Sequence, residues 1–469
     1  MTDTTFLTAT EILPLYKTKQ LSPVELTYDI LGKIDQLNST LNAYITVTPE
    51  LAIEQAKQAE HDMMRGNRRG LLQGVPIGIK DNFFTKGIRT TGGSKILANF
   101  VPDYNATTVN HIYNSGAIIL GKLNMHEFGG GLTNTNPFYG DAKNPWNIAY
   151  TPGGSSGGSG TALAAGLATL ATGTDTFGSI RVPAAMCGIY GLKPTYGLVS
   201  TKGLFPLAWS LDHPGPMARS ATDLALLLQV MAGYDPDDPA SLNVPTPNYM
   251  ECLNRDITGL KIGIPTYFLK GLDGEVERLF KRSINELEDL GAYIIEVDIP
   301  ELSLTTFAEY VTTTAEGATS GNRWLTEFPA DLAQDVRIFL STGAVTQTPQ
   351  YVKAQQARRK LTNAMKNVFE KVDVLVSPTI PIKTPPFSSN WVEQNLDVIE
   401  KCIPFTGPAN LTSIPSLSMP IGLDTNGLPV GMQVMGNHLS EPLLLNIASV
   451  WEKTIRGQRK SGLSEINVT

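Results

Sequence analysis

Glycine is concentrated in one segment of this chain. Residues 152–191 contain 10 of the 43 glycines in 40 of the 469 residues, and they read PGGSSGGSGTALAAGLATLATGTDTFGSIRVPAAMCGIYG. Glycine loses more backbone entropy on folding than other residues, so its crowding needs a reason: a positive φ, a close backbone approach, or amides that face a ligand. This segment is therefore the first candidate for a functional site.

Composition excludes several classes of protein. Acidic residues outnumber basic ones 44 to 37, and the net charge of −7 makes nucleic acid and anionic membranes poor partners. Hydrophobic residues at 42% and charged residues at 17% are typical of a globular protein. The small apolar stretch 160–173 is too short to span a bilayer. The N-terminus lacks a basic segment followed by an apolar one, so we expect a cytoplasmic protein.

Cysteine and histidine are both scarce. The three cysteines lie far apart without a CxxC spacing, which argues against a disulfide framework or a zinc site. No two of the five histidines are spaced i, i+4. We therefore expect no metal and no cofactor, and catalysis that does not depend on histidine.

The hydrophobic pattern predicts alternating helices and strands. The first 65 residues read as helices, one of them starting at Ser22-Pro23 and another at Thr48-Pro49. Strands are predicted in GVPIGIK and AIILGKL, at 260–264, 293–297 and 372–378, and in a hairpin near Asn426-Gly427; helices are predicted at 276–290 and 441–451. This alternation favours an α/β fold around a mixed sheet. The proline-rich segment 235–258 is predicted to be a surface excursion.

Three explanations of the glycine-rich segment conflict with its sequence. A phosphate-binding loop requires a lysine after the glycines, and none is present. The pattern Gly153-x-Ser155-x-Gly157 matches the nucleophile elbow of α/β-hydrolases, but Thr151-Pro152 precedes it instead of a strand, and only His213 or His438 could then serve as base. A flexible linker is inconsistent with the apolar sequence on both sides.

A fourth explanation accounts for several segments together. GTDTFGSIR resembles the nucleophile loop of the amidase signature family, GGSSGGS resembles its paired-serine loop, and GVPIGIKDNF resembles its catalytic-lysine segment. The likeness continues through KPTYG, GPMAR and GLPVGMQVMG and covers roughly residues 5–455. It implies one compact α/β domain with a mixed β-sheet core surrounded by helices, in which an N-terminal helical segment, 1–65, packs on the core formed by 66–469.

The resemblance also assigns catalytic roles. Ser179 would be the nucleophile, Ser155 the bridging serine after a cis peptide at Gly154-Ser155, and Lys80 the base. Such a Ser-cisSer-Lys triad hydrolyses a carboxylic amide to an acid plus ammonia or an amine through an acyl-enzyme. The resemblance further implies an oxyanion hole built from the backbone amides of Thr176, Phe177, Gly178 and Ser179, with supporting roles for Ser156, Arg181 and Asp175.

The chemistry of the triad is physically coherent. A serine hydroxyl needs an adjacent base, and lysine is a base only when it is neutral. At a reference pKa of about 10.4, removing the proton at pH 7 costs about 4.6 kcal/mol. Burial lowers this cost, and the apolar residues Val75, Ile77 and Ile79 suit such burial. We also expect Arg181 to pair with Asp175 and hold the nucleophile loop.

The sequence departs from the family pattern at positions that bear on the substrate. Phe177 stands where glycine is usual, and its ring lies either over the substrate pocket or in the core. The family also includes the glutamine-hydrolysing subunit of a tRNA-dependent amidotransferase, which commonly has Asp at the position of His126. That subunit also has an acid in the stretch matching 402–411, which has none here. These differences favour a stand-alone amidase, and the glutamine-hydrolysing subunit is the alternative.

The substrate is therefore expected to be a small-molecule amide whose acyl group is apolar or aryl. Phe177, Trp324 and Phe328 are the aromatic residues that suggest this. One wall of the site is expected from the glycine loop Gly129, Gly130 and Gly131, and another from residues 305–350. We expect no direct contact with nucleic acid and no membrane association, and self-association as a homodimer is compatible with the sequence.

Overall fold

The computed structural model describes residues 3–459, so the last ten residues of the predicted 66–469 domain lie outside the described residues. An 11-stranded sheet runs through the described chain in the order β1-β3-β2-β4-β6-β5-β10-β11-β9-β7-β8. The strands are β1 Tyr44–Val47, β2 Pro76–Lys80, β3 Ile118–Leu123, β4 Leu170–Asp175, β5 Tyr190–Lys193, β6 His213–Ala218, β7 Lys261–Pro265, β8 Tyr293–Val297, β9 Val374–Pro378, β10 Ser416–Leu423 and β11 Pro429–Gly436.

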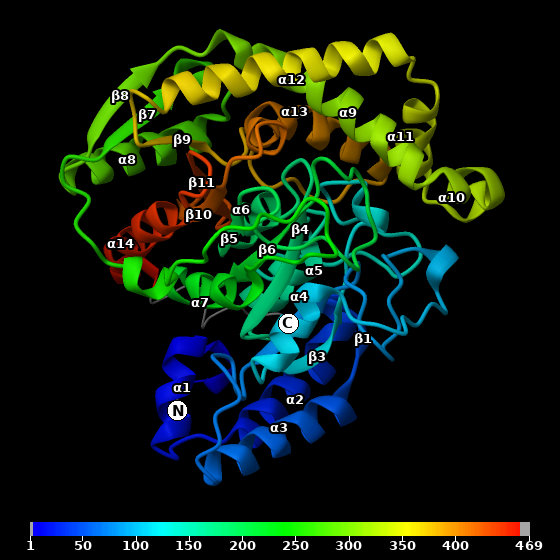
Figure 1. The fold of residues 1–469 in the computed structure, drawn as a ribbon, viewed down its shortest axis with the longest axis vertical. Coiled ribbons are helices and arrows are strands. Elements are labelled where there is room, and N and C mark those ends of the chain that lie inside the picture. The colour runs from blue at the N-terminus through cyan, green and yellow to red at the C-terminus, as the bar shows by residue number, and fades with distance from the viewer. Residues whose placement is uncertain (1–2, 460–469) are drawn as a thin grey trace.

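Helices surround this sheet. They are α1 Ala9–Lys17, α2 Pro23–Leu41, α3 Pro49–Met64, α4 Thr107–Asn114, α5 Gly157–Ala164, α6 Arg181–Cys187, α7 Ala221–Met231, α8 Gly274–Asp289, α9 Thr305–Ser320, α10 Asn322–Glu327, α11 Gln334–Ala344, α12 Thr348–Val368, α13 Trp391–Leu411 and α14 Glu441–Arg459. Figure 1 shows α1–α3 gathered at one end of the molecule and α9–α12 at the other, with β7 and β8 at the end that holds α12.

The sheet is mixed, as predicted. Strand β2 pairs in parallel with β3 and β4, and β7 pairs in parallel with β8 and β9. The strands between these two parallel groups are antiparallel, including the predicted hairpin of β10 and β11. The prediction of one α/β fold with a mixed sheet core surrounded by helices is confirmed.

Most predicted elements are present, with one correction at the N-terminus. Helix α2 begins at Pro23 with the predicted capping box, in which the Ser22 hydroxyl accepts from the Glu25 amide and Glu25 accepts from the Ser22 amide. The expectation that the first 65 residues are helical is wrong for Tyr44–Val47, which forms the edge strand β1 and pairs with β3. A run of four residues is too short for its hydrophobic pattern to distinguish a strand from a loop that connects two helices.

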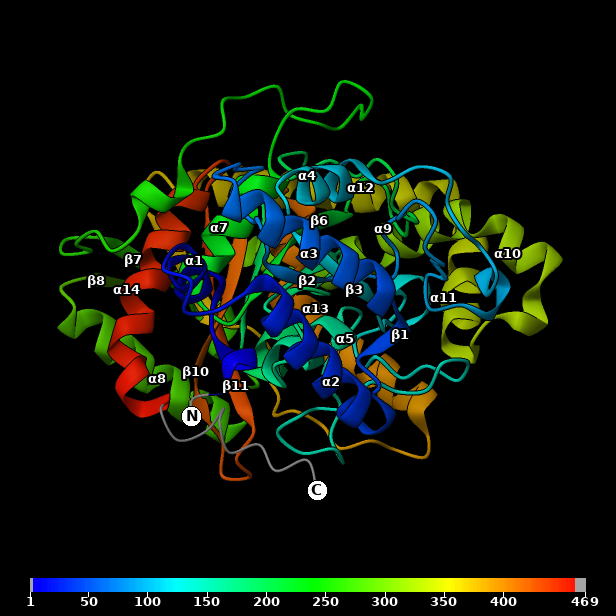
Figure 2. The ribbon, with the colours of Figure 1, turned by 90° about the horizontal axis from the view of Figure 1, so that it is seen from below.

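The proline-rich segment after α7 has no helix or strand before a short 3-10 turn at Tyr249–Cys252, and most of its residues are at least partly exposed. In Figure 2 a green loop beside α7 projects from the body. This agrees with the predicted surface excursion.

The glycine-rich segment passes through the centre of the molecule. Every residue from Thr151 to Thr195 is buried. Helix α5 needs its glycines because backbone lies against them: a Cβ on Gly158 would stand 2.6 Å from the Ala43 carbonyl oxygen and 2.5 Å from the Asn124 amide nitrogen. The glycine excess is therefore first a packing requirement, since it lets α5 approach β3 and the chain before β1.

A pair of glycine variants tests this packing. Gly158→Ala should lower the free energy of unfolding by at least about 3 kcal/mol, because the new methyl group meets backbone that cannot give way. Gly32→Ala is the matched control in an exposed stretch of α2, where nothing lies within 4 Å, and it should be neutral or stabilise by up to about 1 kcal/mol. Urea unfolding measures both, and equal effects would contradict the assignment.

Candidate active site

The Lys80 amine is the centre of the buried polar cluster. Lys80 ends strand β2, its side chain is 0% exposed, and its Nζ lies 2.7 Å from Ser155 Oγ, 2.8 Å from Ser156 Oγ and 2.7 Å from Thr174 Oγ1. Among the described residues no carboxylate lies within ion-pair distance of this nitrogen. Burial lowers the pKa of Lys80 to about 7, although the negative charges of Asp175 and Asp212 oppose that shift.

The paired-serine loop approaches Lys80 from the start of α5. The peptide Gly154-Ser155 is cis, as the family resemblance implies. The Ser155 carbonyl accepts from the His126 amide at 3.1 Å, and the Gly157 amide donates to Asn134 Oδ1 at 3.0 Å. A Cβ on Gly154 would meet the Asn134 amide at 2.8 Å, so the paired-serine loop packs directly on the segment that follows His126.

Ser179 lies in the sharp connection between β4 and α6. The Ser156 amide donates to the Ser179 carbonyl at 3.2 Å, which joins the nucleophile loop to the paired-serine loop. The Ser179 hydroxyl is buried and has no hydrogen-bond partner in the described chain. A buried hydroxyl without a partner in the protein is available to bind a ligand.

A buried ion pair braces this loop. Arg181 donates from Nε to Asp175 Oδ2 and from Nη2 to Asp175 Oδ1, each at 3.0 Å, which is the pairing expected from the sequence. Arg181 also donates to Asn410 Oδ1 at 2.6 Å and to Gln433 Oε1 at 2.9 Å. Burial alone would raise the pKa of the Asp175 carboxyl, but the guanidinium and Asn410 outweigh it and hold the pKa below its usual value.

The backbone amides of the nucleophile loop are not equivalent. The Gly178 amide donates to Asp175 Oδ1 at 2.8 Å, so in this structure it is occupied, and its place in the oxyanion hole stays a prediction. The amides of Thr176, Phe177 and Ser179 make no hydrogen bond within the described chain. Three donors therefore remain available next to the Ser179 hydroxyl.

Asp212 supports the same loop from the side. Its Oδ1 accepts from Thr176 Oγ1 at 2.6 Å, and its two oxygens also accept from the amides of Leu207 and Ala208. Burial raises the pKa of Asp212 to about 6, while these hydrogen bonds oppose that shift. The segment from Leu207 to Asp212 therefore connects the nucleophile loop to the surface.

Apolar side chains cover the other side of Ser179. Phe177 is 1% exposed and belongs to a buried cluster with residues of the glycine loop, α11 and α13, among them Leu132, Val336 and Ile403. Of the two positions predicted for its ring, the structure therefore shows the one in the core.

A small pocket continues this apolar surface outward. It holds about 80 Å³ and is lined by Phe128, Phe205, Leu207, Gly317, Trp324 and Leu340, among others. A Cβ on Gly129 would stand 3.7 Å from both Leu207 and Ser155 Oγ, so the glycine loop separates this pocket from the triad by little more than its own backbone. Trp324 is among the residues that line this pocket, whereas Phe328 is not.

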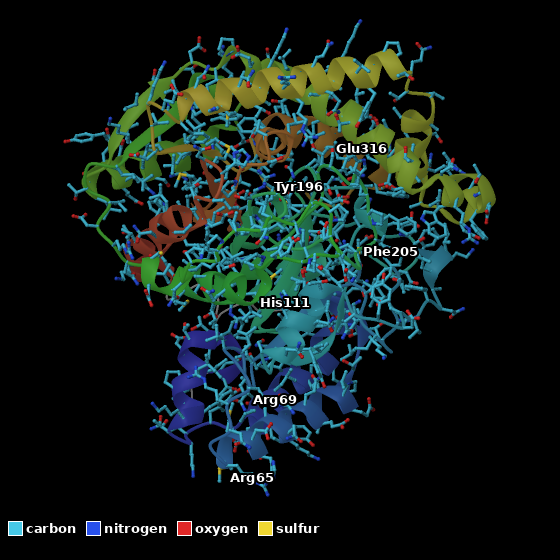
Figure 3. The ribbon with its side chains drawn as sticks, viewed as in Figure 1. Arg65, Arg69, His111, Tyr196, Phe205 and Glu316 are labelled. Carbon is cyan, nitrogen blue, oxygen red and sulfur yellow. The ribbon has the colours of Figure 1, made fainter. Side chains whose placement is uncertain are left out.

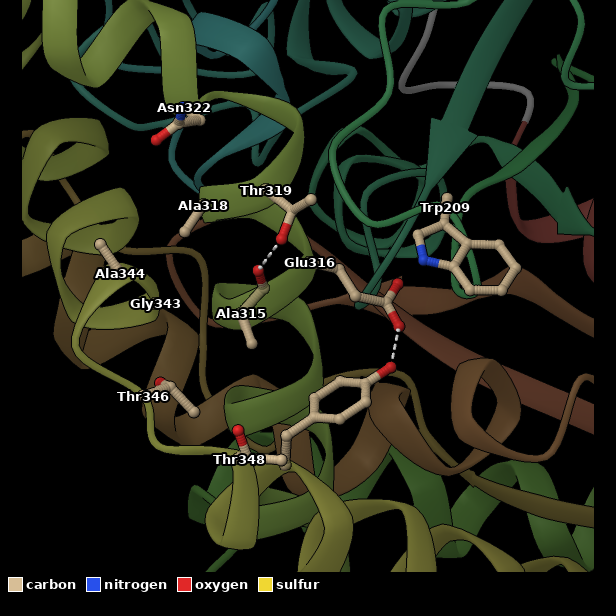
Figure 4. A pocket seen from close by; sticks show the side chains of 11 residues that line it. Trp209, Ala315, Glu316, Ala318, Thr319, Asn322, Gly343, Ala344, Thr346 and Thr348 are labelled. Atoms are coloured by element: carbon tan, nitrogen blue, oxygen red, sulfur yellow. Dashed lines mark hydrogen bonds between the residues drawn. The ribbon is translucent and has the colours of Figure 1, made fainter.

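A second cavity, of about 600 Å³, lies on the other side of α9 (Figure 4). Glu316 on its wall accepts from the Tyr351 hydroxyl at 2.9 Å and from the Ser210 hydroxyl at 2.8 Å, and Trp209 faces it with 65% of its surface exposed. Figure 3 labels Phe205, which lines the small pocket, and Glu316, which lines the large cavity. Glu316 thus anchors the segment that carries Asp212.

The sequence relatives agree with this geometry. The amidase family model matches residues 25–445. A glutamyl-tRNA(Gln) amidotransferase subunit of Methylococcus capsulatus is 42% identical over 473 residues, covering 95% of this chain and 96% of that protein. The chain belongs to the amidase signature family.

Solved structures of this family superpose closely on the amidase. One, from work on a vestigial protein complex and the evolutionary origins of an s-triazine catabolic enzyme, aligns with a TM-score of 0.90 and 31% identity over 96% of this chain and 98% of that one. A bacterial aryl acylamidase of the family aligns with a TM-score of 0.88 and 27% identity over 98% and 97%. The protein is therefore a hydrolase that acts on carbon–nitrogen amide bonds.

The α/β-hydrolase alternative is wrong for this amidase. Ser155 Oγ is bonded to Lys80 and lies before a helix, without a strand leading into it. His213 Nδ1 is 2.5 Å from the Leu211 carbonyl, and burial keeps the pKa of this ring well below its usual value. The strand–turn–helix unit is the one around Ser179 instead.

Several residues of the site carried no usable signal in the sequence. Thr174, Asp212, Asn410 and Gln433 reach the triad or its ion pair only through the fold. Thr174 stands in GTDTFGSIR, Asn410 in the stretch 402–411 and Gln433 in GLPVGMQVMG, so these segments were noted in the sequence, but the contacts of the three residues were not predicted. No group of three metal-ligating side chains and no helix long and apolar enough to cross a bilayer occurs in residues 3–459.

Proposed function

We propose that the amidase hydrolyses its substrate with Ser179 as nucleophile, Ser155 as the proton bridge and Lys80 as the base. The observation that carries this assignment is the fully buried Lys80 amine, bonded to Ser155 Oγ at 2.7 Å without an ion-pair partner. A pKa lowered to about 7 gives Lys80 a large neutral fraction at physiological pH. A neutral amine accepts a proton, whereas a charged one cannot.

In the acylation step the Ser179 oxygen attacks the amide carbonyl carbon. Its proton passes to Ser155 Oγ while the Ser155 proton passes to Lys80 Nζ, and the carbonyl π bond breaks to leave an oxyanion. The free amides of Thr176, Phe177 and Ser179 are the donors available to this oxyanion, and losing one such donor costs about 3 kcal/mol. Lys80 then returns a proton through Ser155 to the leaving nitrogen as the carbon–nitrogen bond breaks.

In the deacylation step water takes the place of the leaving group. Lys80, neutral again, accepts a water proton through Ser155, and the resulting hydroxide attacks the ester carbon of the acyl-enzyme. Collapse of the intermediate releases the acid and returns the proton to Ser179. Ser156 and Thr174 keep the lysine amine in place during both steps, because their hydroxyls are its remaining partners.

For the substrate we propose an amide with an apolar or aryl acyl group, hydrolysed without a partner subunit. The buried cluster around Phe177 and the pocket beside Trp324 and Phe128 support this, since none of the residues lining that pocket is charged. Glutamine hydrolysis is the second candidate, and the 42% identity to an amidotransferase subunit favours it. A zwitterionic amino acid would need charged partners, and an apolar wall offers none.

Replacement of the triad residues should abolish turnover. Ser179→Ala and Lys80→Ala should each reduce kcat/KM by at least about a thousandfold, because they remove the nucleophile and its base. A fluorophosphonate should label Ser179, as located by mass spectrometry of the digested protein.

The matched control is Ser159→Ala. Ser159 is a buried serine of α5 that donates to the Thr172 carbonyl and does not contact Lys80. Labelling and turnover should persist in this variant. Label on Ser155, or activity that survives in Ser179→Ala, would contradict the assignment.

A substrate screen separates the two candidates. With ammonia or amine release as the readout, aryl and aliphatic amides should be turned over with kcat/KM at least about tenfold above that for glutamine, in line with the apolar wall. Phe177→Gly should reduce the ratio of kcat/KM for aryl and aliphatic amides to kcat/KM for glutamine, because it removes an aromatic ring from the apolar cluster. Glutamine as the best substrate of the isolated chain would instead support the amidotransferase alternative.

A further inference from the structure

The glycine loop beside the triad is tied at both ends. At one end, His126 Nε2 lies 2.8 Å from Asp335 Oδ2, and both side chains are 0% exposed. At the other end, the Leu132 amide donates to Asn395 Oδ1 at 2.9 Å. Asn395 Nδ2 then donates to the same Asp335 Oδ2 at 2.8 Å, which closes a ring of hydrogen bonds. We call His126, Asp335 and Asn395 the clasp.

The clasp joins three parts of the chain that cover the site. His126 follows β3, Asp335 lies in the first turn of α11, and Asn395 lies in α13. The neighbouring Glu127 adds a second bond to the start of α11, because its Oε2 accepts from the Ala333 amide at 2.7 Å. Helix α11, which contributes Leu340 to the small pocket, is thus hydrogen-bonded to the loop and does not merely lie against it.

The loop has no room to move within the clasp. A Cβ on Gly131 would collide with the His126 ring and stand 2.6 Å from Asn395 Nδ2, and a Cβ on Gly130 would stand 3.2 Å from Val336 of α11. On the opposite side, Gly129 faces Ser155 Oγ, and the Gly131 carbonyl lies where a Cβ on Gly154 would meet it at 3.0 Å. A shift of α11 or α13 would therefore press on the paired-serine loop.

One further bond connects the clasp directly to the triad. The backbone amide of His126 donates to the Ser155 carbonyl, while its imidazole binds Asp335. A single residue thus fixes both the bridging serine and the start of α11. Because proton transfer requires hydrogen-bond distances at each step, a change of a fraction of an ångström at Ser155 lowers the rate.

We infer that His126, Asp335 and Asn395 are positioning residues that set the glycine loop and Ser155 at their working distance from Ser179. The inference rests on the proposed triad and deepens it. In the clasp His126 donates to Asp335 of α11. The family's glutamine-hydrolysing subunit commonly has Asp at the position of His126. The clasp contacts no reacting atom, so its effect is on alignment.

A double-mutant cycle tests the clasp. His126→Leu and Asp335→Leu should each lower kcat/KM at least tenfold per active site, with active sites counted by complete fluorophosphonate labelling. The double variant should lose no more than the worse single variant, because either change already breaks the same bond. His126→Gln keeps a side-chain amide donor and should recover activity to within about threefold of the wild type.

The matched control is Asp331→Asn. Asp331 lies four residues before Asp335 and forms an exposed ion pair with Lys95 at 2.6 Å, so its loss should change kcat/KM less than twofold. A merely structural role of the clasp would lower the melting temperature and the labelled fraction while kcat/KM per labelled site stayed within twofold, and that result would overturn the inference. Additive losses in the cycle would overturn it as well. If the Ser179→Ala variant stayed active, the proposed triad would be wrong. The effect of the clasp variants could still be tested by comparing their turnover per folded molecule.

Discussion

The buried polar cluster that we propose as the active site of this amidase depends on one amine. Lys80 is surrounded by hydroxyl groups, and no carboxylate of residues 3–459 lies within ion-pair distance of its Nζ, so a positive charge there has no direct partner. Burying an unpaired ion is costly, and the group responds by releasing its proton near neutral pH. The surrounding segments bury this amine. Lys80 is the last residue of strand β2, and the glycines of α5 let that helix pack directly against neighbouring backbone.

Two carboxylates, Asp175 and Asp212, lie near Lys80, but both are hydrogen-bonded to other groups. Asp175 lies close enough to affect Lys80, but its carboxylate is held by Arg181 and Asn410. The same ion pair occupies the Gly178 amide and so fixes the turn that carries Ser179. Asp212 is held by Thr176 and by backbone amides. Each acid thus positions a part of the nucleophile loop without forming an ion pair with Lys80.

The sequence predicted what is encoded in local motifs. The mixed sheet, the hairpin, the capping box at Ser22 and the cis peptide before Ser155 all agree with the structure. The rest depends on contacts between distant segments: the edge strand β1, the clasp partners Asp335 and Asn395, and the ion-pair partners Asn410 and Gln433. No periodicity marks a polar residue on a buried helix face as a partner of one loop among many, so these residues emerged only from the fold. The hydrogen bond that occupies the Gly178 amide could likewise be found only from atomic positions.

The central claim is that the unprotonated Lys80 is the base, and its most direct test is the pH dependence of Ser179 labelling by a fluorophosphonate in the wild type and in Asp212→Asn. A pKa of about 7 predicts a rate that rises through neutral pH to a plateau. Removing the negative charge of Asp212, which favours the charged lysine, should move the midpoint to lower pH. A wild-type rate that falls as the pH rises through 7, or a rise that disappears in Asp212→Asn, would contradict the account.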